Sequence, residues 1–371
     1  MDHDDLDSHR IRIHGPEDFE GMRKAGRLAA ATLDFITPYV QPGVTTGELD
    51  RLLEQYIRDH GGVPAPLGYR GFPKANCISV NHVVCHGIPG DKRLQNGDIL
   101  NIDVTPILDG WYGDSSRMYL CGDVGVKAKK LVDVTYDALM IGIAQVKPGA
   151  TLGDVGHAIQ TFAEGHRYSV VRDFCGHGLG RVFHEPPSVL HFGNPGTGAV
   201  LREGMIFTIE PMINAGRYDV KILGDGWTAV TKDKSLSAQF EHSIGVTKDG
   251  CEIFTLSLPA STSPPTPSRP RKRPPPYDIP AAVIFARKRY SPNAHSRMVA
   301  SGWRDGRARS GRGKRRRLKG FPGWNRPPTS PWRRPIKRLI KRLITRATAS
   351  VSTPDSSTAG RMLCRITSCW R

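Results

Sequence analysis

The chain repeats part of its own sequence at a spacing of 106 residues (151 − 45 = 106). Residues 40–60 read VQPGVTTGELDRLLEQYIRDH and residues 146–166 read VKPGATLGDVGHAIQTFAEGH, with six of the 21 aligned positions identical. In each copy a Pro-Gly turn leads to a threonine, Thr45 or Thr151, that stands three residues before an acid. This is the capping-box signature of a helix start. Each copy therefore predicts a turn and an amphipathic helix, and their similarity indicates a duplicated unit.

The regions around the two copies also resemble each other, which argues against chance recurrence of a common helix start. A helical pattern precedes each copy, over residues 17–36 and 126–143. Runs rich in Ile, Val and Phe cover residues 77–80, 98–108, 168–171, 205–210 and 239–246. The sequence thus predicts an α+β fold made of two related helix-helix-strand halves.

Charge divides the chain into two parts of different character. Residues 1–255 hold 25 Lys+Arg and 32 Asp+Glu, a net charge of 25 − 32 = −7. Residues 256–371 hold 28 and 3, a net charge of 28 − 3 = +25, and the sum of −7 and +25 is the +18 of the whole chain. The high pI describes the tail, so it does not argue for nucleic-acid binding by the folded part.

Composition predicts three regions: a flexible segment at residues 1–13, a folded domain at 14–256 and a basic Pro/Arg-rich tail at 257–371. The tail includes PASTSPPTPSRPRKRPPP and RDGRARSGRGKRRRLKG, which cannot bury a core and predict disorder. Its IKRLIKRLI stretch has a basic amphipathic pattern suited to an anionic surface. An out-of-frame or misannotated 3′ end explains the same composition equally well.

Cysteine usage and the lack of long apolar stretches favour a cytoplasmic protein. The seven cysteines are an odd number without a C-x-x-C pair, which fits a reducing compartment. The N-terminus, MDHDDLDSHRIRIHG, has no apolar run of the kind found in secretory signals. No stretch of about 18 apolar residues occurs, and we expect no membrane span.

Five side chains that can bind metal occur where strands or tight turns would bury them. Asp103 is flanked by Ile102 and Val104 in a strand-like run, and Asp114 follows a DG turn that would fold it back beside Asp103. The other three are His177 between glycines in CGHGLG, Glu210 at the end of MIFTIE, and Glu241 in QFEHS.

Four carboxylates and one imidazole buried together would need a cation to offset their desolvation and repulsion. Bridging carboxylates would let five residues serve two adjacent ions. An oxygen-rich set with one histidine suits Mn, Fe or Co at least as well as Zn. A capped turn or an ion pair is the simpler explanation for any one acid alone, but the five together favour a divalent-metal site.

Several long motifs resemble, in order, those of type I methionine aminopeptidases. They are GYRGFPKANCISVNHVVCHGIP, NIDVTPILDGWYGDSS, CGHGLGRVFHEPP, FTIEPM and DGWTAVTKDKSLSAQFEH, and the resemblance runs from about residue 14 to residue 255. It implies the pseudo-twofold pita-bread fold, with a central antiparallel sheet flanked by helices. It also implies a hydrolase that removes the N-terminal methionine from nascent proteins and peptides with a small second residue. The implied nucleophile is a hydroxide bridging two divalent ions (Co, Mn, Fe or Zn).

The resemblance also implies roles for single residues. The metal ligands would be Asp103, Asp114, His177, Glu210 and Glu241, with Asp114 and Glu241 bridging. His86 and His184 would bind substrate and stabilise the developing oxyanion, and Glu210 would shuttle a proton. The pocket for the methionine side chain would be lined by Tyr69, Phe72, Cys77, Phe183 and Trp227, a surface suited to a thioether.

Two other functions stay open on the sequence. A proline-specific aminopeptidase or prolidase shares the fold, the five ligands and the dinuclear mechanism, although the GYRGFP and DGWTAVTKDKSLSAQFEH segments favour methionine release. A binding protein could use the fold as a platform, with the tail touching RNA, the ribosome or an anionic membrane. We expect a monomer that acts on the N-terminal Met of nascent peptides. We also hypothesise that the tail is drawn to ribosomal RNA.

Overall fold

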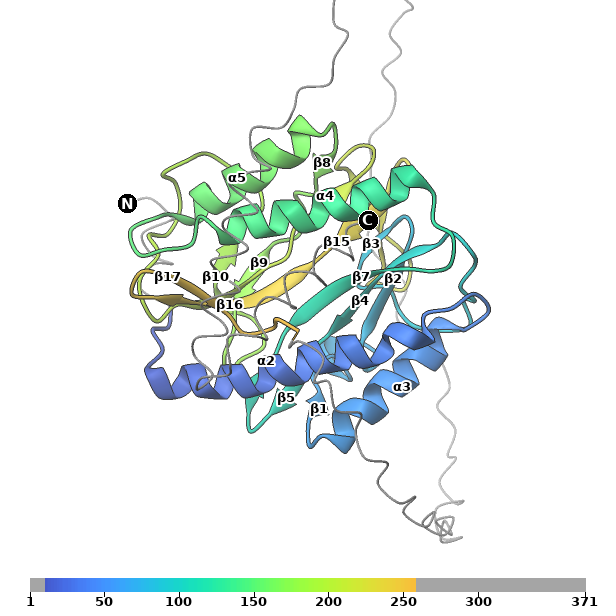
Figure 1. Ribbon diagram of the computed structural model, residues 1–371, viewed down its shortest axis with the longest axis horizontal. Coiled ribbons are helices and arrows are strands. Elements are labelled where there is room, and N and C mark those ends of the chain that lie inside the picture. The colour runs from blue at the N-terminus through green and yellow to red at the C-terminus, as the bar shows by residue number, and fades with distance from the viewer. Residues whose placement is uncertain (1–10, 258–371) are drawn as a thin grey trace, which may run out of the picture. The chain divides into compact units, whose positions relative to one another are not determined.

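The computed structural model describes residues 11–257 (Figure 1). The predicted basic tail lies outside the described residues apart from residue 257, and so do residues 1–10 of the predicted N-terminal segment. Ile11 and His14, at the start of the described part, are buried. Packing therefore begins at the first described residue.

Within residues 11–257, four α-helices form two consecutive pairs at the spacing of the sequence repeat. They are α2 (Pro16–Ile36), α3 (Thr46–Asp59), α4 (Val126–Ile143) and α5 (Leu152–Gly165), with 3-10 turns at η1 (Thr37–Tyr39) and η2 (Tyr69–Gly71). Helices α3 and α5 start after Thr45 and Thr151, and both predicted capping boxes are confirmed. None of the helices in this range is long and apolar enough to cross a membrane.

Eight antiparallel strands form the large sheet. They are β2 (Cys77–Val80), β4 (Ile99–Val104), β7 (Ser115–Leu120), β9 (Gly176–Gly178), β10 (Glu185–Val189), β11 (Ile206–Ile209), β16 (Glu241–Thr247) and β17 (Gly250–Ile253). Their order is β10-β9-β11-β16-β7-β4-β2, with β17 paired to β16. The order β9-β11-β16 from the second half mirrors β2-β4-β7 from the first, so the sheet is pseudo-symmetric about the β16–β7 pair.

Three smaller sheets of three strands each surround this one. They consist of β1 (Val63–Pro64), β5 (Pro106–Leu108) and β6 (Trp111–Tyr112); β8 (Ser169–Val170), β12 (Met212–Asn214) and β15 (Ser237–Gln239); and β3 (Val83–Cys85), β13 (Val220–Ile222) and β14 (Ala229–Thr231). The run 98–108, predicted as one strand-like stretch, divides at Thr105 between β4 and β5. Pro106 has no N–H to donate and cannot continue the β4 ladder.

The large sheet has one face packed by helices and one polar face. In β4, Ile102 packs in a hydrophobic cluster with residues of α2 and α3, and in β11 Ile209 packs in a second cluster with residues of α4 and α5. Each helix pair thus packs against the strands of its own half, and in Figure 1 α2 and α3 lie at the bottom of the picture and α4 and α5 near the top. Each fully buried Ile or Leu contributes about 1.5–3 kcal/mol to folding. Because side chains alternate along a strand, Asp103 and Glu210, the next residues, point to the other face.

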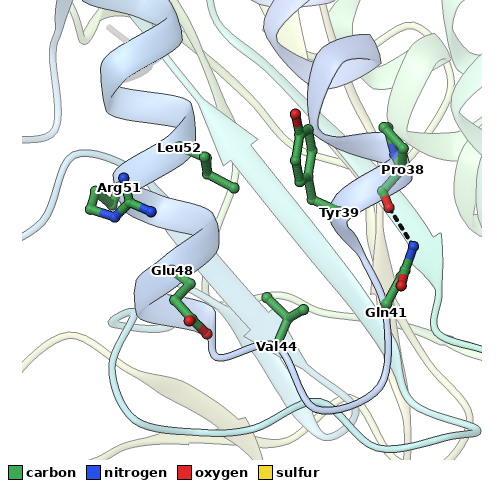
Figure 2. Close-up of a pocket in the computed structure, with 7 residues that line it drawn as sticks. All are labelled: Pro38, Tyr39, Gln41, Val44, Glu48, Arg51 and Leu52. Carbon is green, nitrogen blue, oxygen red and sulfur yellow. Dashed lines mark hydrogen bonds between the residues drawn. The ribbon is translucent and has the colours of Figure 1, made fainter. Parts of the chain in front are cut away.

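A pocket of about 250 Å³ lies where α2 ends and α3 begins (Figure 2). It is lined by Pro38, Tyr39, Gln41, Val44, Glu48, Arg51 and Leu52. Tyr39 and Leu52 face one another across it, and the Gln41 amide donates to the Pro38 carbonyl at 2.8 Å. None of the residues predicted for catalysis, metal binding or substrate binding lines this pocket.

The two capping boxes predict the stability of cap variants. Replacing Thr45 or Thr151 by alanine removes one capping acceptor, and each change should lower the free energy of unfolding by about 1 kcal/mol. The caps share no partner, so the losses should add in the double variant to within about 0.5 kcal/mol. Urea unfolding followed by circular dichroism measures this, with Thr161→Ala on the exposed side of α5 as the control. Full stability of both cap variants would contradict the prediction.

Candidate active site

Strand register aligns three carboxylates across the polar face of the large sheet. Asp103 of β4 lies directly opposite Ser116 of β7, and Ser116 lies directly opposite Glu241 of β16. Opposed residues on neighbouring strands share a face. Strand β11 ends beside the first residues of β16, which places Glu210 next to Glu241. The row therefore follows from the pairing of β4, β7, β16 and β11.

Asp114 and His177 complete the cluster. Asp114 directly precedes β7 and is 3% exposed, while His177 is the central residue of β9. Its Nε2 lies 3.4 Å from Oδ2 of Asp114 and 3.6 Å from Oε1 of Glu210. Ligand atoms of Asp114, His177 and Glu241 lie within 4.8 Å of one another. The structure thus brings the five candidate residues together on one face, with three of them converging most closely.

Glycines on both sides of His177 allow β9 to approach its neighbours. A Cβ at Gly178 would collide with the carbonyl oxygen of Pro186, and one at Gly176 with that of Thr208. The His177 N–H donates to the Thr208 hydroxyl at 3.0 Å. These contacts fix the backbone that carries the imidazole.

Side chains behind the row orient two of the carboxylates. The Thr105 hydroxyl donates to Oδ1 of Asp114 at 2.8 Å, and the Thr208 hydroxyl donates to Oε1 of Glu210 at 2.8 Å. The Gln239 amide donates to the other oxygen, Oε2, of Glu210 at 3.2 Å. These hydrogen bonds orient the carboxylates of Asp114 and Glu210.

His191 supports the same site from the backbone side. It is fully buried, and its Nε2 accepts the Glu210 N–H at 3.0 Å. Burial lowers the pKa of His191 to about 3, so the ring stays neutral, with its proton on Nδ1. That Nδ1 has no hydrogen-bond partner among the described residues.

Sequence reasoning missed Thr105, Thr208, Gln239 and His191. A signal was available for the two threonines. Thr105 follows Asp103 by two residues and Thr208 precedes Glu210 by two, a spacing that puts both members of each pair on one side of an extended chain. Gln239 shows the same spacing, because it lies two residues before Glu241, whereas His191 lies in no strand and no local pattern connects it to Glu210.

Desolvation and mutual repulsion shift the pKa values of the clustered acids. Burial raises the pKa of Asp103 and of Glu241 well above the ordinary carboxyl range, and the neighbouring Asp114 raises both further. Burial also raises the pKa of Glu210 to about 7. Burial disfavours a charge on His177, but Asp114 and Glu210 outweigh it and raise the pKa of the imidazole.

The two predicted non-ligand histidines lie beside this cluster. His86 follows β3 with a left-handed backbone (φ 55°) and packs edge-on against Phe174 and Trp227; burial lowers its pKa. The His184 ring centroid is 4.2 Å from that of His177. Partial burial, together with His177, lowers the pKa of His184 to about 4. Both imidazoles are thus neutral near pH 7.

Four of the five residues predicted for the methionine pocket make two aromatic contacts, and the fifth is a cysteine on β2. Tyr69 and Phe183 have ring centroids 4.8 Å apart, and Phe72 meets Trp227 edge-on at 5.2 Å. Cys77 lies directly opposite Asp103 in the β2–β4 ladder. Burial raises the pKa of Cys77 well above that of a free thiol, so it presents a neutral, polarizable surface.

The sequence profile of metallopeptidase family M24 matches residues 20–248, a stretch that contains the whole carboxylate and histidine cluster. The chain belongs to metallopeptidase family M24. It is 66% identical over 248 residues to the methionine aminopeptidase of Rickettsia prowazekii, covering 67% of this chain and 96% of that enzyme. Identity to the methionine aminopeptidase of Escherichia coli K12 is 55% over 248 residues, covering 66% and 94%. The crystal structure of the Rickettsia enzyme matches with a TM-score of 0.66 and 66% identity, covering 66% of this chain and all of that one (100%).

Membership of family M24 gives the chain the pita-bread fold of these structures, and the resemblance to type I methionine aminopeptidases is confirmed. The chain is a metallo-aminopeptidase, a hydrolase. The predicted α+β class and duplicated halves are confirmed in the described residues.

The M24 family implies divalent metal, and the side chains present fit it. Throughout residues 11–257, no lysine or arginine forms an ion pair with Asp103, Asp114, Glu210 or Glu241. Carboxylate oxygens with a single imidazole are a donor set for hard and borderline divalent ions. A cation at this point would offset the repulsion that raises the carboxyl pKa values.

The crowding of acids predicts that removing a charge stabilises the metal-free protein. In Asp103→Asn without metal at pH 7.5, the free energy of unfolding should rise by about 1–4 kcal/mol, because a half-buried, desolvated carboxylate that pairs with no lysine or arginine is lost. Urea unfolding in chelator measures this. The same change at Asp109, which is exposed, is the matched control and should shift stability by less than about 0.5 kcal/mol. Lower stability of metal-free Asp103→Asn would contradict the electrostatic interpretation.

Proposed function

We propose that this chain removes the N-terminal methionine from nascent proteins and peptides whose second residue is small. The observation that carries the proposal is the row of carboxylates completed by His177, whose ring lies near those of Phe183 and His184. The high identity to methionine aminopeptidases supports this substrate over the proline-specific alternative.

We infer that Asp103, Asp114, His177, Glu210 and Glu241 would together hold two divalent ions. Each carboxylate has two oxygens and can be shared by two ions, and ligand atoms of Asp114, His177 and Glu241 converge within 4.8 Å. When bound, the ions would supply a hydroxide nucleophile near neutral pH and polarise the scissile carbonyl. Co, Mn, Fe and Zn all remain compatible with this donor set.

In this proposal, Glu210 moves the proton. Its two oxygens are held by Thr208 and Gln239, and Oε1 faces His177 at 3.6 Å. A carboxylate fixed at this point can take the proton of the attacking water and deliver it to the leaving amine. No covalent intermediate with the enzyme is required.

His86 and His184 act in this proposal as neutral donors to the substrate and to the developing oxyanion. Their lowered pKa values keep them uncharged at neutral pH, so each has one N–H to donate. Preorganised donors of this kind stabilise the transition state because they need not reorient as charge develops.

The aromatic contacts define where the methionine side chain would lie. Tyr69, Phe72, Phe183 and Trp227, with the Cys77 thiol, form a polarizable lining that suits a flexible thioether. A closed pocket of this kind leaves little room beyond the scissile bond, so a small second residue should be favoured.

We propose that the enzyme works as a monomer in the cytoplasm, where nascent chains emerge. The five ligands, the two histidines and the pocket residues all come from one chain, so no second copy is needed to complete the site.

Mass spectrometry of short peptides tests the activity. Full-length protein in Mn or Co should remove Met from a peptide beginning Met-Ala much faster than from one beginning Met-Leu, and should leave Ala-Pro intact. Asp103→Asn should lower the rate at least about 100-fold because a metal ligand is lost, whereas the exposed Asp109→Asn should not. Cleavage of Ala-Pro instead would identify a proline-specific enzyme, and no cleavage in any metal would favour a binding platform.

We also propose that the +25 segment at residues 256–371 draws the enzyme to ribosomal RNA. Co-sedimentation with ribosomes should be strong at about 50 mM salt and lost by about 300 mM, since phosphate contacts release counter-ions. A chain ending at Ser257 should sediment far less. Ribosome binding that does not change with salt concentration, or that is equally strong in the chain ending at Ser257, would contradict this proposal.

A further inference from the structure

A hydrogen bond joins Tyr69 and His184, which are 115 residues apart in the sequence. The hydroxyl of Tyr69 lies 2.9 Å from Nδ1 of His184, and the two rings stack with centroids 5.2 Å apart at 26°. Tyr69 is predicted above only as a wall of the methionine pocket. A wall needs the ring, but it does not need this hydroxyl contact.

The turn that carries Tyr69 is held tightly. Residues Gly68, Arg70 and Gly71 all have left-handed backbones, with φ of 83°, 47° and 89°. Hydrogen bonds from the Gly68 N–H to the Phe72 carbonyl (2.8 Å) and from the Phe72 N–H to the Tyr69 carbonyl (2.9 Å) close it from within. A left-handed arginine between two such glycines is uncommon and costs free energy, which marks the conformation as required.

The segment that carries His184 is held from the other side. The Tyr112 N–H donates to the Gly180 carbonyl at 2.9 Å, and the Tyr112 ring stacks on Phe183 at 5.4 Å. Tyr69 and His184 therefore meet as two fixed groups. Their hydrogen bond selects a state of the imidazole rather than pulling two loops together.

The chemistry of the bond determines which nitrogen carries the proton. A neutral imidazole has one N–H, and a phenol is a better donor than acceptor. When the Tyr69 hydroxyl donates to Nδ1, the ring proton must lie on Nε2, the nitrogen that points away from Tyr69. In the opposite tautomer Nε2 would be a bare acceptor and could not stabilise negative charge.

We propose that Tyr69 is a positioning residue whose hydroxyl holds His184 in the Nε2–H tautomer, so that this imidazole can donate a hydrogen bond to the reacting substrate. The inference rests on the proposed function, because it assigns His184 a donor role in methionine removal. It adds a second task to Tyr69, separate from contact with the methionine side chain.

A double-mutant cycle tests the proposal with full-length protein in Mn. Tyr69→Phe keeps the ring and removes only the hydroxyl, so kcat for a Met-Ala peptide should fall about 5- to 20-fold while KM changes less than about twofold. In His184→Ala, kcat for the same peptide should fall further than in Tyr69→Phe. In that background, Tyr69→Phe should have no additional effect beyond about twofold, since the hydroxyl acts through His184.

Tyr56→Phe is the matched control. Tyr56 also contacts a histidine ring, that of His60, with centroids 4.0 Å apart and the rings tilted by 30°, but it lies on α3 outside the proposed site. Its kcat and KM should stay at wild-type values. Thermal unfolding of each variant confirms that the fold is kept.

Nitrogen NMR of protein labelled with ¹⁵N-histidine gives a readout that packing alone would not move. The His184 signals, assigned by their loss in His184→Ala, should show the Nε2–H form in wild type and a mixture of tautomers in Tyr69→Phe.

Three outcomes would overturn the proposal. Wild-type kcat with a raised KM in Tyr69→Phe would leave Tyr69 as a pocket wall only. An equal fall in kcat in the His184→Ala background would show that the hydroxyl acts elsewhere. Wild-type activity of His184→Ala would show that His184 is not a donor in the reaction. Absence of the expected effect in Tyr69→Phe alone would contradict this proposal but leave the proposed aminopeptidase function intact.

Discussion

Mutual repulsion among four carboxylates, two of them buried and two half-buried, is the constraint on which the rest of the structure depends. Asp103, Asp114, Glu210 and Glu241 lie on one face of the large sheet, and within residues 11–257 none of them pairs with lysine or arginine. Burial raises the pKa of Asp103, Glu210 and Glu241, so at neutral pH these carboxylates lower the free energy of unfolding. The helix-packed face of the same strands, with its two hydrophobic clusters, offsets that cost. The bound cations would remove much of it.

The duplication explains where the acids meet. Asp103 and Glu210 are separated by 107 residues, close to the 106-residue repeat, and stand at corresponding ends of β4 and β11. Strands β7 and β16 pair along the line between the halves, so Glu241 faces the β7 residue that also faces Asp103. The centre forms at this line because only there do strand ends from both halves come together.

Local signals in the sequence predicted what local interactions determine. The capping boxes at Thr45 and Thr151 depend on residues three positions away, and both helices start where the pattern predicts. The alternation around Asp103 likewise predicted a buried acid on a strand. The division of residues 98–108 between two sheets was not predicted, because it depends on which partners β5 finds.

Contacts between distant residues set the limit of that reasoning. Gln239 contacts Glu210 because β15 leads into β16, which pairs with the strand that Glu210 follows. Tyr69 contacts His184 because segments from the two halves of the chain meet there. Composition and periodicity carry no information on such pairings. The resemblance to known aminopeptidases named Tyr69 and His184 as site residues, but it named no interaction between them.

The acids come from both halves of the chain, but other groups of the proposed site come from one half only. Asp114 directly precedes β7 and Glu241 begins β16, and these two strands correspond to each other across the halves, so the two acids are also counterparts although 127 residues separate them. His177 comes from the second half, and the ring that contacts His184 comes from the first. A metal centre needs like charges from both halves, whereas substrate orientation needs different groups on its two sides. The corresponding strands of the two halves supply the first requirement, and the segments around residues 69 and 184 supply the second.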